Sequence, residues 1–365
     1  MEISKRVLLS MNNRENFFNA IHGKPFEKVP FMLDLCTSLQ EEFSRQYNTR
    51  DFESLFGCPF TRAELNPSKH PVDYTKYFQE LGQVDRIDEW GVGYRNGSVA
   101  HFATFVSPMS LFETPEEVWD FPLPDMLADY RWEGVAEHIR SLKEQDRIVM
   151  NGTVNIDIFE PAWYLRGMEN FLMDMLADPE MAEACLDRIA NIKTQLARKF
   201  AEAGVDVLVF GDDVGTERGM MMSVETWRTW LKPRLAAAIR AAKEANPEVL
   251  CYYHSDGDIR EIIPELIEVG VDILNPIQPE CMDPVEIYNT YVDRVAFWGT
   301  IGTQTTMPFG TREEVVEKTS EMLELCKERG KLVIAPTHLL EPEVPVENIM
   351  AFVNTVHQFN EKMRK

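Results

Sequence analysis

The chain has 365 residues, of which 60 are acidic and 37 are basic, giving a formal net charge of −23. Nucleic acids and anionic membranes attract basic surfaces, so this charge argues against both as partners. Hydrophobic residues make up 44% of the sequence, which is enough for a large core. No run of about 18 apolar residues occurs, so no membrane-spanning helix is predicted.

The cysteines indicate a reducing environment. The chain has 6 of them, and they form neither a CxxC pair nor the regular spacing of a disulfide framework. A free cysteine in an apolar run behaves as a small hydrophobic residue. Residues 1–13 lack the long apolar region of a secretory signal peptide. We therefore expect a cytoplasmic protein with free cysteines.

The predicted elements begin with a helix from Arg14 that stops at Gly23, because its apolar residues have helical spacing. A strand at 29–34 follows. Seven more short apolar runs are predicted as strands, at residues 58–64, 147–151, 205–210, 249–254, 271–275, 295–299 and 331–335. No low-complexity tract or glycine- and serine-rich linker interrupts them, so residues 1–365 are predicted to form a single domain.

Helices separate most of these strands. They are predicted at 178–203, 224–245, 259–269 and 311–329, and Thr311 with Glu314 forms a capping box at the start of the last one. The strands are continuously apolar, which is typical of parallel strands covered on both faces. Eight strands that alternate with helices predict an α/β fold of one (β/α)8 TIM barrel, preceded by an N-terminal helix.

One segment breaks the alternation of strands and helices. Residues 86–97 contain short alternating runs and the turn dipeptide Asn96-Gly97, which together predict a β-hairpin inserted after the second strand. Residues 104–129 carry four prolines and continue the irregular stretch. This insertion is placed to cover one mouth of the barrel.

Polar residues follow most of the predicted strands. In a parallel barrel these positions share one rim, where the chemistry takes place. The candidates are Asp34, Glu64, Asn151, Asp212, Asp213, His254, Asp256, Asn275, Gln278, Thr303, Gln304 and His338. Grouping so many ionisable side chains is costly without a function, and acids beside histidines shift one another's pKa. The rim therefore indicates acid–base chemistry or a bound cation.

A metal is the sharper hypothesis for this rim. His254 and Asp256 end one strand and His338 follows another. Two imidazoles and a carboxylate suit zinc with an open fourth position, or non-haem iron. Cys281, in a loop, is a less favoured ligand. Simpler explanations stay open, because His254 can be a hydrogen-bonded core histidine, His338 can serve in packing, and Asp256 can cap the next helix.

Nucleotide-binding and hydrolase signatures are absent. The sequence contains no GxxxxGK[ST], no GxGxxG and no GxSxG pattern. A P-loop, a dinucleotide-binding fingerprint and an α/β-hydrolase nucleophile elbow are therefore not predicted.

Several motifs, in their order along the chain, resemble the uroporphyrinogen decarboxylase superfamily from about residue 13 to residue 359. They are Asn13-Arg14-Glu15 with His22-Gly23-Lys24 and Val29-Pro30, then Gly211–Thr216 with Ser223–Pro233, His254–Ile259, Asn275–Pro279, Trp298–Ile301, Ile334–His338 and Pro345–Ile349. The resemblance implies a (β/α)8 barrel with its site at the carboxyl ends of the strands, in agreement with the strand pattern.

The superfamily has a decarboxylase branch that removes the acetate arms of uroporphyrinogen without a cofactor. Its members carry an arginine-rich segment after the first strand, whereas residues 31–38 here contain no arginine and include Asp34. Negative charge at Asp34, Asp212 and Asp213 opposes a polycarboxylate substrate. Uroporphyrinogen decarboxylation, or another small-molecule lyase or hydrolase reaction, is thus an alternative function.

The other branch comprises methyltransferases that work with corrinoid proteins, often with zinc bound by His-x-Cys and a distant cysteine. His254 matches the first ligand, while Asp256 and His338 stand where that branch has cysteines. A zinc site without thiolates is more positive and suits an oxygen or nitrogen substituent. The resemblance thus implies a demethylase that moves a methyl group from a small O- or N-methyl compound to cobalamin on a partner corrinoid protein, and it also implies a homodimer.

Roles follow for the remaining candidates. Asp212, Asp213, Glu160 and Tyr164 are predicted catalytic residues that orient the substrate or supply a proton. The predicted substrate-binding residues are Asp34, Asn275, Gln278, Gln304 and Trp90, although the aromatic residues can equally belong to the core. A barrel that only binds a small molecule or tetrapyrrole is a further alternative, which the many ionisable rim residues disfavour.

Overall fold

The computed structural model describes residues 11–79, 82, 84–97 and 103–365. Its strands are β1 (Phe60–Ala63), β2 (Arg86–Ile87), β3 (Gly93–Asn96), β4 (Ala103–Val106), β5 (Ile148–Asn151), β6 (Val207–Gly211), β7 (Gly215–Thr216), β8 (Gly219–Met220), β9 (Leu250–His254), β10 (Ile273–Asn275), β11 (Ala296–Trp298) and β12 (Leu332–Val333).

The helices are α1 (Asn13–Ile21), α2 (Thr37–Tyr47), α3 (Phe52–Phe56), α4 (Pro115–Asp120), α5 (Asp129–Trp132), α6 (Val135–Glu144), α7 (Phe159–Arg166), α8 (Met168–Ala177), α9 (Pro179–Ala203), α10 (Val224–Trp230), α11 (Lys232–Ala245), α12 (Ile263–Glu268), α13 (Pro284–Tyr291), α14 (Thr306–Phe309), α15 (Arg312–Arg329) and α16 (Val346–Met363), with a 3-10 turn at Thr75–Tyr77.

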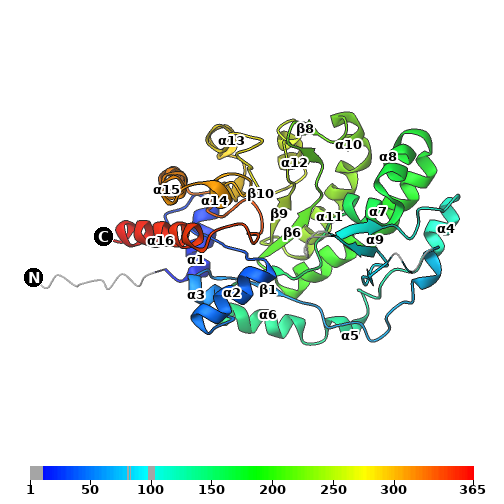
Figure 1. Ribbon diagram of the computed structural model, residues 1–365, viewed down its shortest axis with the longest axis horizontal. Helices are drawn as coiled ribbons and strands as arrows, with labels where there is room; N and C mark the ends of the chain where they lie inside the picture. The colour runs from blue at the N-terminus through cyan, green and yellow to red at the C-terminus, as the bar shows by residue number, and fades with distance from the viewer. Residues whose placement is uncertain (1–10, 80–81, 83, 98–102) are drawn as a thin grey trace, which may run out of the picture.

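Seven parallel strands form a curled central sheet in the order β1-β5-β6-β9-β10-β11-β12. This order follows the chain, so each strand reaches its neighbour through a crossover connection on the outside of the sheet. In Figure 1, α9 and α11 lie to the right of the central strands and α15 and α16 to the left, so these helices flank the curled sheet on its outside. The predicted α/β barrel class is confirmed.

The first predicted strand differs from the others. Residues 29–35 are extended, but they meet the end of the sheet only through isolated bridges, from Phe31 to Ile334 and from Leu35 to Leu340. Pro30 has no N–H to donate, which weakens a ladder at this point. The described sheet therefore has seven strands rather than eight, and this extended segment lies beside its last strand.

The interior of the barrel is filled by inward-facing side chains that alternate along the strands. Those of Phe60, Val207, Leu250 and Trp298 belong to one buried cluster, which also contains Phe17 of α1. The ring of Phe17 lies 5.3 Å from that of Phe60 and 6.3 Å from that of Trp298, between centroids. Because Phe60 begins β1, helix α1 closes the amino-terminal end of the barrel and leaves the carboxyl end as the place for a site.

Replacing Phe17 by alanine is expected to lower the free energy of unfolding by about 3–5 kcal/mol, because the cavity left under the barrel cannot collapse. Urea denaturation measures this loss. Phe309→Ala is the matched control, since Phe309 is 77% exposed and its removal should change stability little. Equal losses in the two variants would contradict the closing role of α1.

Two predicted helices are shorter than the sequence pattern suggests, and proline explains both. The helix predicted at 224–245 is divided into α10 and α11 at Leu231, with Pro233 in the first turn of α11. The helix predicted at 259–269 reduces to α12, which also has a proline in its first turn. Proline lacks an N–H and fits only the first turn of a helix. In contrast, α15 begins with the predicted Thr311–Glu314 capping box.

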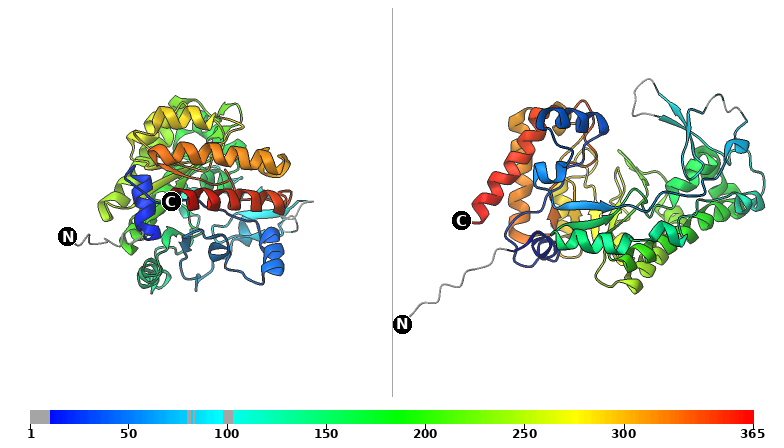
Figure 2. Two further views of the ribbon diagram at one scale, coloured as in Figure 1. Left: turned by 90° about the vertical axis from the view of Figure 1, so that its left-hand side faces the viewer. Right: turned by 90° about the horizontal axis from the view of Figure 1, so that it is seen from below.

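The inserted segment forms a three-stranded antiparallel sheet, β2-β3-β4. Its first turn lies at Asp88–Val92, where Asp88 Oδ1 accepts the N–H groups of Trp90 and Val92. Asn96 is the last residue of β3 and Gly97 follows it, while residues 98–102 lie outside the described residues, so the turn at Asn96-Gly97 stays a prediction. In Figure 2 the inserted strands lie at the opposite end of the molecule from α16. Phe105 of β4 contacts the ring of Tyr164 on α7 at 4.3 Å between centroids.

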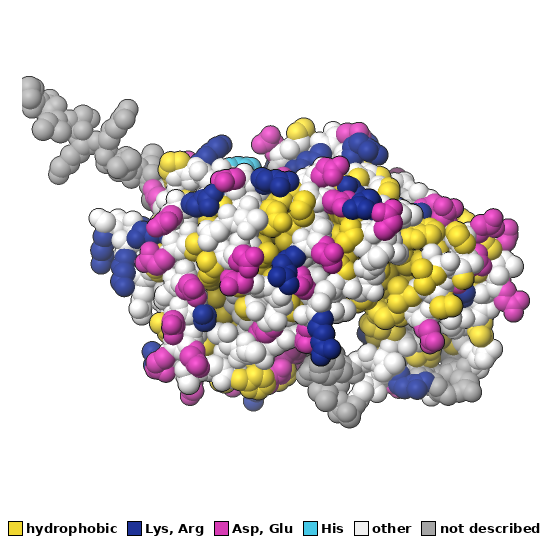
Figure 3. All heavy atoms as spheres, turned by 90° about the horizontal axis from the view of Figure 1, so that it is seen from above, with side chains coloured by type: hydrophobic (Ala, Val, Ile, Leu, Met, Phe, Trp, Pro, Cys, Tyr) yellow, Lys and Arg dark blue, Asp and Glu magenta, His cyan; other side chains and the backbone are white. Residues whose placement is uncertain are grey.

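The surface carries both signs of charge. On the face in Figure 3, acidic and basic side chains are interspersed among hydrophobic ones, and no broad basic patch is visible among the residues described. In the part of the chain that the structure describes, no helix is long and apolar enough to cross a membrane. This face therefore lacks the basic footprint that nucleic-acid binding requires.

Candidate functional site

A cavity of about 300 Å³ opens at the carboxyl end of the barrel. His254, Asn275 and Trp298, the last residues of β9, β10 and β11, line it together with His338. Neighbouring parallel strands deliver their final side chains to one rim, which is why residues so far apart in the sequence meet here.

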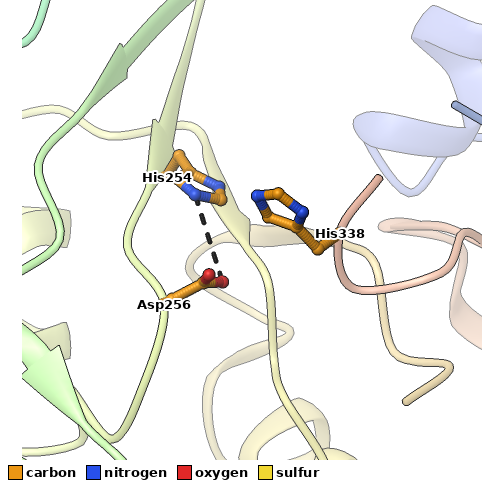
Figure 4. Close-up of side chains that lie close together, drawn as sticks. All are labelled: His254, Asp256 and His338. Carbon is orange, nitrogen blue, oxygen red and sulfur yellow. Dashed lines mark ion pairs between the residues drawn. The ribbon is translucent and has the colours of Figure 1, made fainter. Parts of the chain in front are cut away.

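Three of the predicted ligands come together at this rim. His254 ends β9, Asp256 follows two residues later, and His338 comes from the loop after β12. One potential ligand atom from each residue lies within 4.8 Å of those of the other two. His254 Nε2 is 4.0 Å from Asp256 Oδ1, and Figure 4 shows the three side chains turned toward one another. Helix α12 starts well after Asp256, so the capping explanation for Asp256 is wrong.

Hydrogen bonds to Asn275 fix the protonation of the His254 ring. Asn275 Nδ2 donates to the carbonyl of Trp298 at 2.8 Å, so the amide oxygen of Asn275 must face His254 Nδ1, 2.6 Å away. An amide oxygen only accepts, and Nδ1 therefore carries the proton. The Nε2 lone pair is left facing the cluster, which is the arrangement of a metal-binding histidine held by a neighbouring group.

The donor set fits zinc. Tetrahedral zinc with ligands at about 2.0–2.2 Å brings its ligand atoms to about 3.4 Å from one another. Because the ligand atoms lie within 4.8 Å of one another, the widest pair would close by up to about 1.4 Å to reach that geometry, and His338 is exposed. Two imidazoles and one carboxylate leave a fourth position open toward the cavity.

The charges around His254 favour a cation. Burial lowers the pKa of His254, but the carboxylates of Asp256 and Asp213 and the bond to Asn275 outweigh burial, so its pKa is raised. Burial raises the pKa of Asp256, with a further rise from Asp213, although His254 opposes both. A metal ion between these groups would stabilise the carboxylates and replace the proton on the imidazole.

Asp213, Glu160 and Tyr164 extend the polar site behind the cluster. Asp213 Oδ1 accepts the N–H of Asp256 at 2.8 Å and lies 3.6 Å from His254 Nε2. Glu160 accepts the Tyr164 hydroxyl at 2.5 Å. Burial and the charge of Asp213 raise the pKa of Glu160 to about 7. Glu160 therefore holds a proton close to neutral pH, and Tyr164 orients its carboxyl group.

Asp212 has a different role from its neighbour Asp213. Its buried carboxylate accepts the N–H groups of Ile158, Phe159 and Glu160 at 2.7–3.2 Å. These groups begin α7 and have no partner within the helix. Burial raises the pKa of Asp212, while these N–H donors favour its ionised form. Asp212 thus holds the helix that carries Glu160 and Tyr164.

Replacing Asp212 by alanine is expected to lower the free energy of unfolding by about 3 kcal/mol or more, because buried N–H groups lose their acceptor. The neighbouring variant Asp213→Ala should cost only about 1 kcal/mol, since Asp213 accepts a single backbone bond at a partly exposed position. Urea unfolding of the two variants tests this, and a larger loss for Asp213→Ala would contradict the assignment.

Two predicted substrate-binding residues, Gln278 and Asn275, hold neighbouring parts of the rim in place. Gln278 is buried, and its Oε1 accepts the N–H of Gly257 at 3.0 Å, which holds the loop next to Asp256. Asn275 is also buried, and its side-chain oxygen accepts a hydrogen bond from His254 Nδ1. Asp34 lines the cavity and forms an ion pair with Arg62 at 3.4 Å.

The remaining predicted residues lie outside this cavity. Gln304 is exposed in the loop after β11. Trp90 lies in the β2–β3 turn, with Lys193 Nζ 4.6 Å from its ring centroid. Cys281 lines a separate hollow beside α13 and α15, outside the cluster of three ligands. Burial raises the pKa of its thiol to about 11, so little thiolate is present to bind a metal near neutral pH.

Comparison with known proteins places the fold in a family. The model of the family described as uroporphyrinogen decarboxylase (URO-D) matches residues 12–359. The chain belongs to the URO-D family. The comparison with curated proteins found no match.

One of the similar solved structures shares the fold of this chain. A methyltransferase from Methanosarcina mazei has 18% sequence identity and a TM-score of 0.69, with 96% of this chain and 99% of that chain covered. Native xylanase 10B from Thermotoga maritima has 13% identity and a TM-score of 0.40, with coverage of 64% and 82%. The GH10 protein from Paenibacillus barcinonensis has 12% identity and a TM-score of 0.36, with coverage of 56% and 69%. Identities at this level describe the architecture only.

Several cavity residues of this URO-D family chain were not predicted, and two of them are polar residues on strands. Arg62 and Tyr252 line the cavity from within β1 and β9. Each lies two residues from an inward-facing neighbour, Phe60 or His254, so strand alternation directs it inward as well. The signal in the sequence is a charged residue inside the otherwise uncharged strand Phe60–Ala63.

Proposed function

We propose that this URO-D family chain is a metal-assisted methyltransferase. It takes the methyl group from a small O- or N-methyl compound, and the methyl group passes to a corrinoid carried by a partner protein. The observation that carries this proposal is the cluster of His254, Asp256 and His338, whose ligand atoms lie within 4.8 Å of one another at the cavity. The fold shared with the Methanosarcina mazei methyltransferase supports it.

His254, Asp256 and His338 would hold zinc at this place. When bound, zinc supplies a Lewis acid for the oxygen or nitrogen that carries the methyl group. The absence of a thiolate among the three candidate ligands leaves more positive charge at the site, which suits an oxygen or nitrogen leaving group better than sulfur.

The chain's own residues position the substrate and supply the proton that the leaving group takes up. Asn275 keeps the Nε2 lone pair of His254 directed at the cluster. Glu160 holds a proton for the departing heteroatom, and Tyr164 fixes the orientation of its carboxyl group. Tyr252 and Trp298, with rings 5.3 Å apart between centroids, form an aromatic wall that excludes water from the methyl group.

Uroporphyrinogen decarboxylation fits this cavity less well. The volume of about 300 Å³ is at the lower end for small-molecule sites, while uroporphyrinogen is a tetrapyrrole with eight carboxylates. Among the described lining residues, Arg62 supplies the one guanidinium. Incubation with uroporphyrinogen is expected to give no decarboxylated porphyrin. The corrinoid partner, the homodimer and the cytoplasmic location stay predictions.

Methyl transfer to cob(I)alamin tests the proposal. The purified, zinc-loaded chain is mixed with cob(I)alamin and a panel of methoxy and N-methyl compounds, and methylcobalamin is followed by its absorption spectrum. We expect methylcobalamin with at least one compound, and none with the His338→Ala variant. A panel without any product, or product that is independent of His338, would overturn the proposal.

A further inference from the structure

Arg62 brings a positive charge to the cavity at the carboxyl end of the barrel. Its strand neighbour Phe60 packs in the interior cluster with Met150 and Val209. Arg62 lies two residues further along β1, so the same alternation turns its side chain inward, and it lines the cavity. Its side chain is 39% exposed, so water reaches the guanidinium at the mouth of the cavity.

The ion pair between Arg62 and Asp34 is weak. Arg62 Nη2 donates to Asp34 Oδ2 at 3.4 Å, which is long for a charge-assisted bond. The two side chains are 39% and 46% exposed, and a pair of that exposure contributes only about 0–1 kcal/mol. A guanidinium has five N–H donors, and this single long contact leaves most of its binding capacity for a ligand in the cavity.

Arg62 and His254 line the cavity from strands that are not neighbours, whereas His338 comes from the loop whose Leu340 N–H bonds to the carbonyl of Asp34. Strands β5 and β6 separate β1, which carries Arg62, from β9, which carries His254. Apolar side chains of Met150 and Val209 come from the strands between them, and Trp298 faces the same cavity. A ligand that touches both Arg62 and His254 therefore needs an anionic group for the guanidinium, an apolar body, and a group for the metal.

We propose that Arg62 anchors a carboxylate of the methyl donor, so that the substrate is a small methylated carboxylic acid. This inference rests on the proposed function and names its substrate class. The planar guanidinium matches a carboxylate through two parallel hydrogen bonds. A volume of about 300 Å³ corresponds to about ten water-sized groups, which suits a compound the size of a methoxybenzoate.

Asp34 is a specificity residue in this arrangement. While the cavity is empty it holds Arg62 by the 3.4 Å contact, and a carboxylate ligand must compete with it for the guanidinium. Asp34 also disfavours a second negative charge on the substrate by like-charge repulsion. The site thus selects one carboxylate rather than several.

Matched acid and amide probes test the assignment in binding alone. The full-length, zinc-loaded chain is titrated calorimetrically with 3-methoxybenzoate and 3-methoxybenzamide, and with methoxyacetate and methoxyacetamide. For at least one pair we expect the acid to bind about tenfold or more tightly than the amide, as a charge-assisted bond predicts. Arg62→Gln should remove this preference by weakening the binding of the acid more than that of the amide, and Asp34→Asn should increase it.

Two results would overturn the proposal. One is equal binding of acid and amide in both pairs. The other is a preference for the acid that persists in Arg62→Gln, which would mean that the carboxylate binds the metal instead. Because no methyl group moves in this experiment, a preference that depends on Arg62 stands even if the cob(I)alamin assay yields no product. Product with neutral donors alone would support the proposed function and contradict the anchor.

Discussion

His254→Ala is expected to lose the bound zinc and to lower the rate of methyl transfer by about a thousandfold, since Lewis-acid activation contributes several kcal/mol. His254 is the ligand with the most restrained geometry, because Asn275 holds its ring and Asp256 and Asp213 surround its Nε2. Removing it leaves one imidazole and one carboxylate, too few for a structural or catalytic zinc site. Elemental analysis and the cob(I)alamin assay measure the two effects.

The matched control for this variant is His138→Ala. His138 is an exposed histidine on α6, away from the barrel mouth, and its loss should leave both zinc content and rate unchanged. Asn275→Ala should give an intermediate result, since loss of the group that orients a ligand costs about 10–100-fold in metal affinity. Full zinc content and full rate in His254→Ala would contradict the assignment of His254 as a ligand.

Glu160→Gln is expected to stabilise the metal-free protein by about 2 kcal/mol at about pH 8 and to have little effect at about pH 5. Burial and the charge of Asp213 raise the pKa of Glu160 from 4.5 to about 7. A raised carboxyl pKa means that the folded state binds the proton more tightly. The stability contributed by this protonated group is therefore complete below pH 4.5 and is lost as the pH rises through about 7.

Urea unfolding at the two pH values measures this difference. Glutamine stays neutral, so the variant lacks the cost of a buried charge at the higher pH. The exposed Glu347→Gln on α16 is the control and should show no such pH dependence. The measurement uses metal-free protein because a bound cation would favour the carboxylate. A stability difference that is the same at both pH values would contradict the proton-holding role of Glu160.

The cluster of His254, Asp256 and His338 illustrates what the sequence can predict. His254 and His338 each close an apolar run, and parallel strands in a barrel end at the same rim. Their proximity follows from the strand pattern alone, without any knowledge of side-chain conformations. Asp256 follows for the same reason, as it lies just past the end of β9.

Other features depend on contacts that the pattern does not encode. Asp212 and Asp213 are adjacent in the sequence, yet Asp212 turns to the free N–H groups of α7 while Asp213 turns to Asp256 and His254. Gln304 and Trp90 lie in loops, where no period fixes the direction of a side chain. Arg62 lies within a strand rather than after it, so a search of the strand ends does not select it.

Departures in the fold have local causes. Pro30 weakens the first predicted strand, and Pro233 divides a predicted helix into α10 and α11. The apolar periodicity continues through Pro233, because α10 and α11 each bury an apolar face and therefore have the same helical spacing of apolar residues. At these prolines the apolar spacing predicts a continuous element, but proline has no N–H to donate to the backbone hydrogen bonds. The strand or helix is therefore interrupted there.

X-ray absorption at the zinc edge of the purified, zinc-loaded chain tests the central claim most directly. The account predicts one zinc per chain, bound by two imidazole nitrogens and by oxygen at about 2.0–2.2 Å. It also predicts that the imidazole signal decreases in His254→Ala and His338→Ala. A sulfur ligand at about 2.3 Å, or a chain that binds no zinc at all, would contradict a site formed by His254, Asp256 and His338.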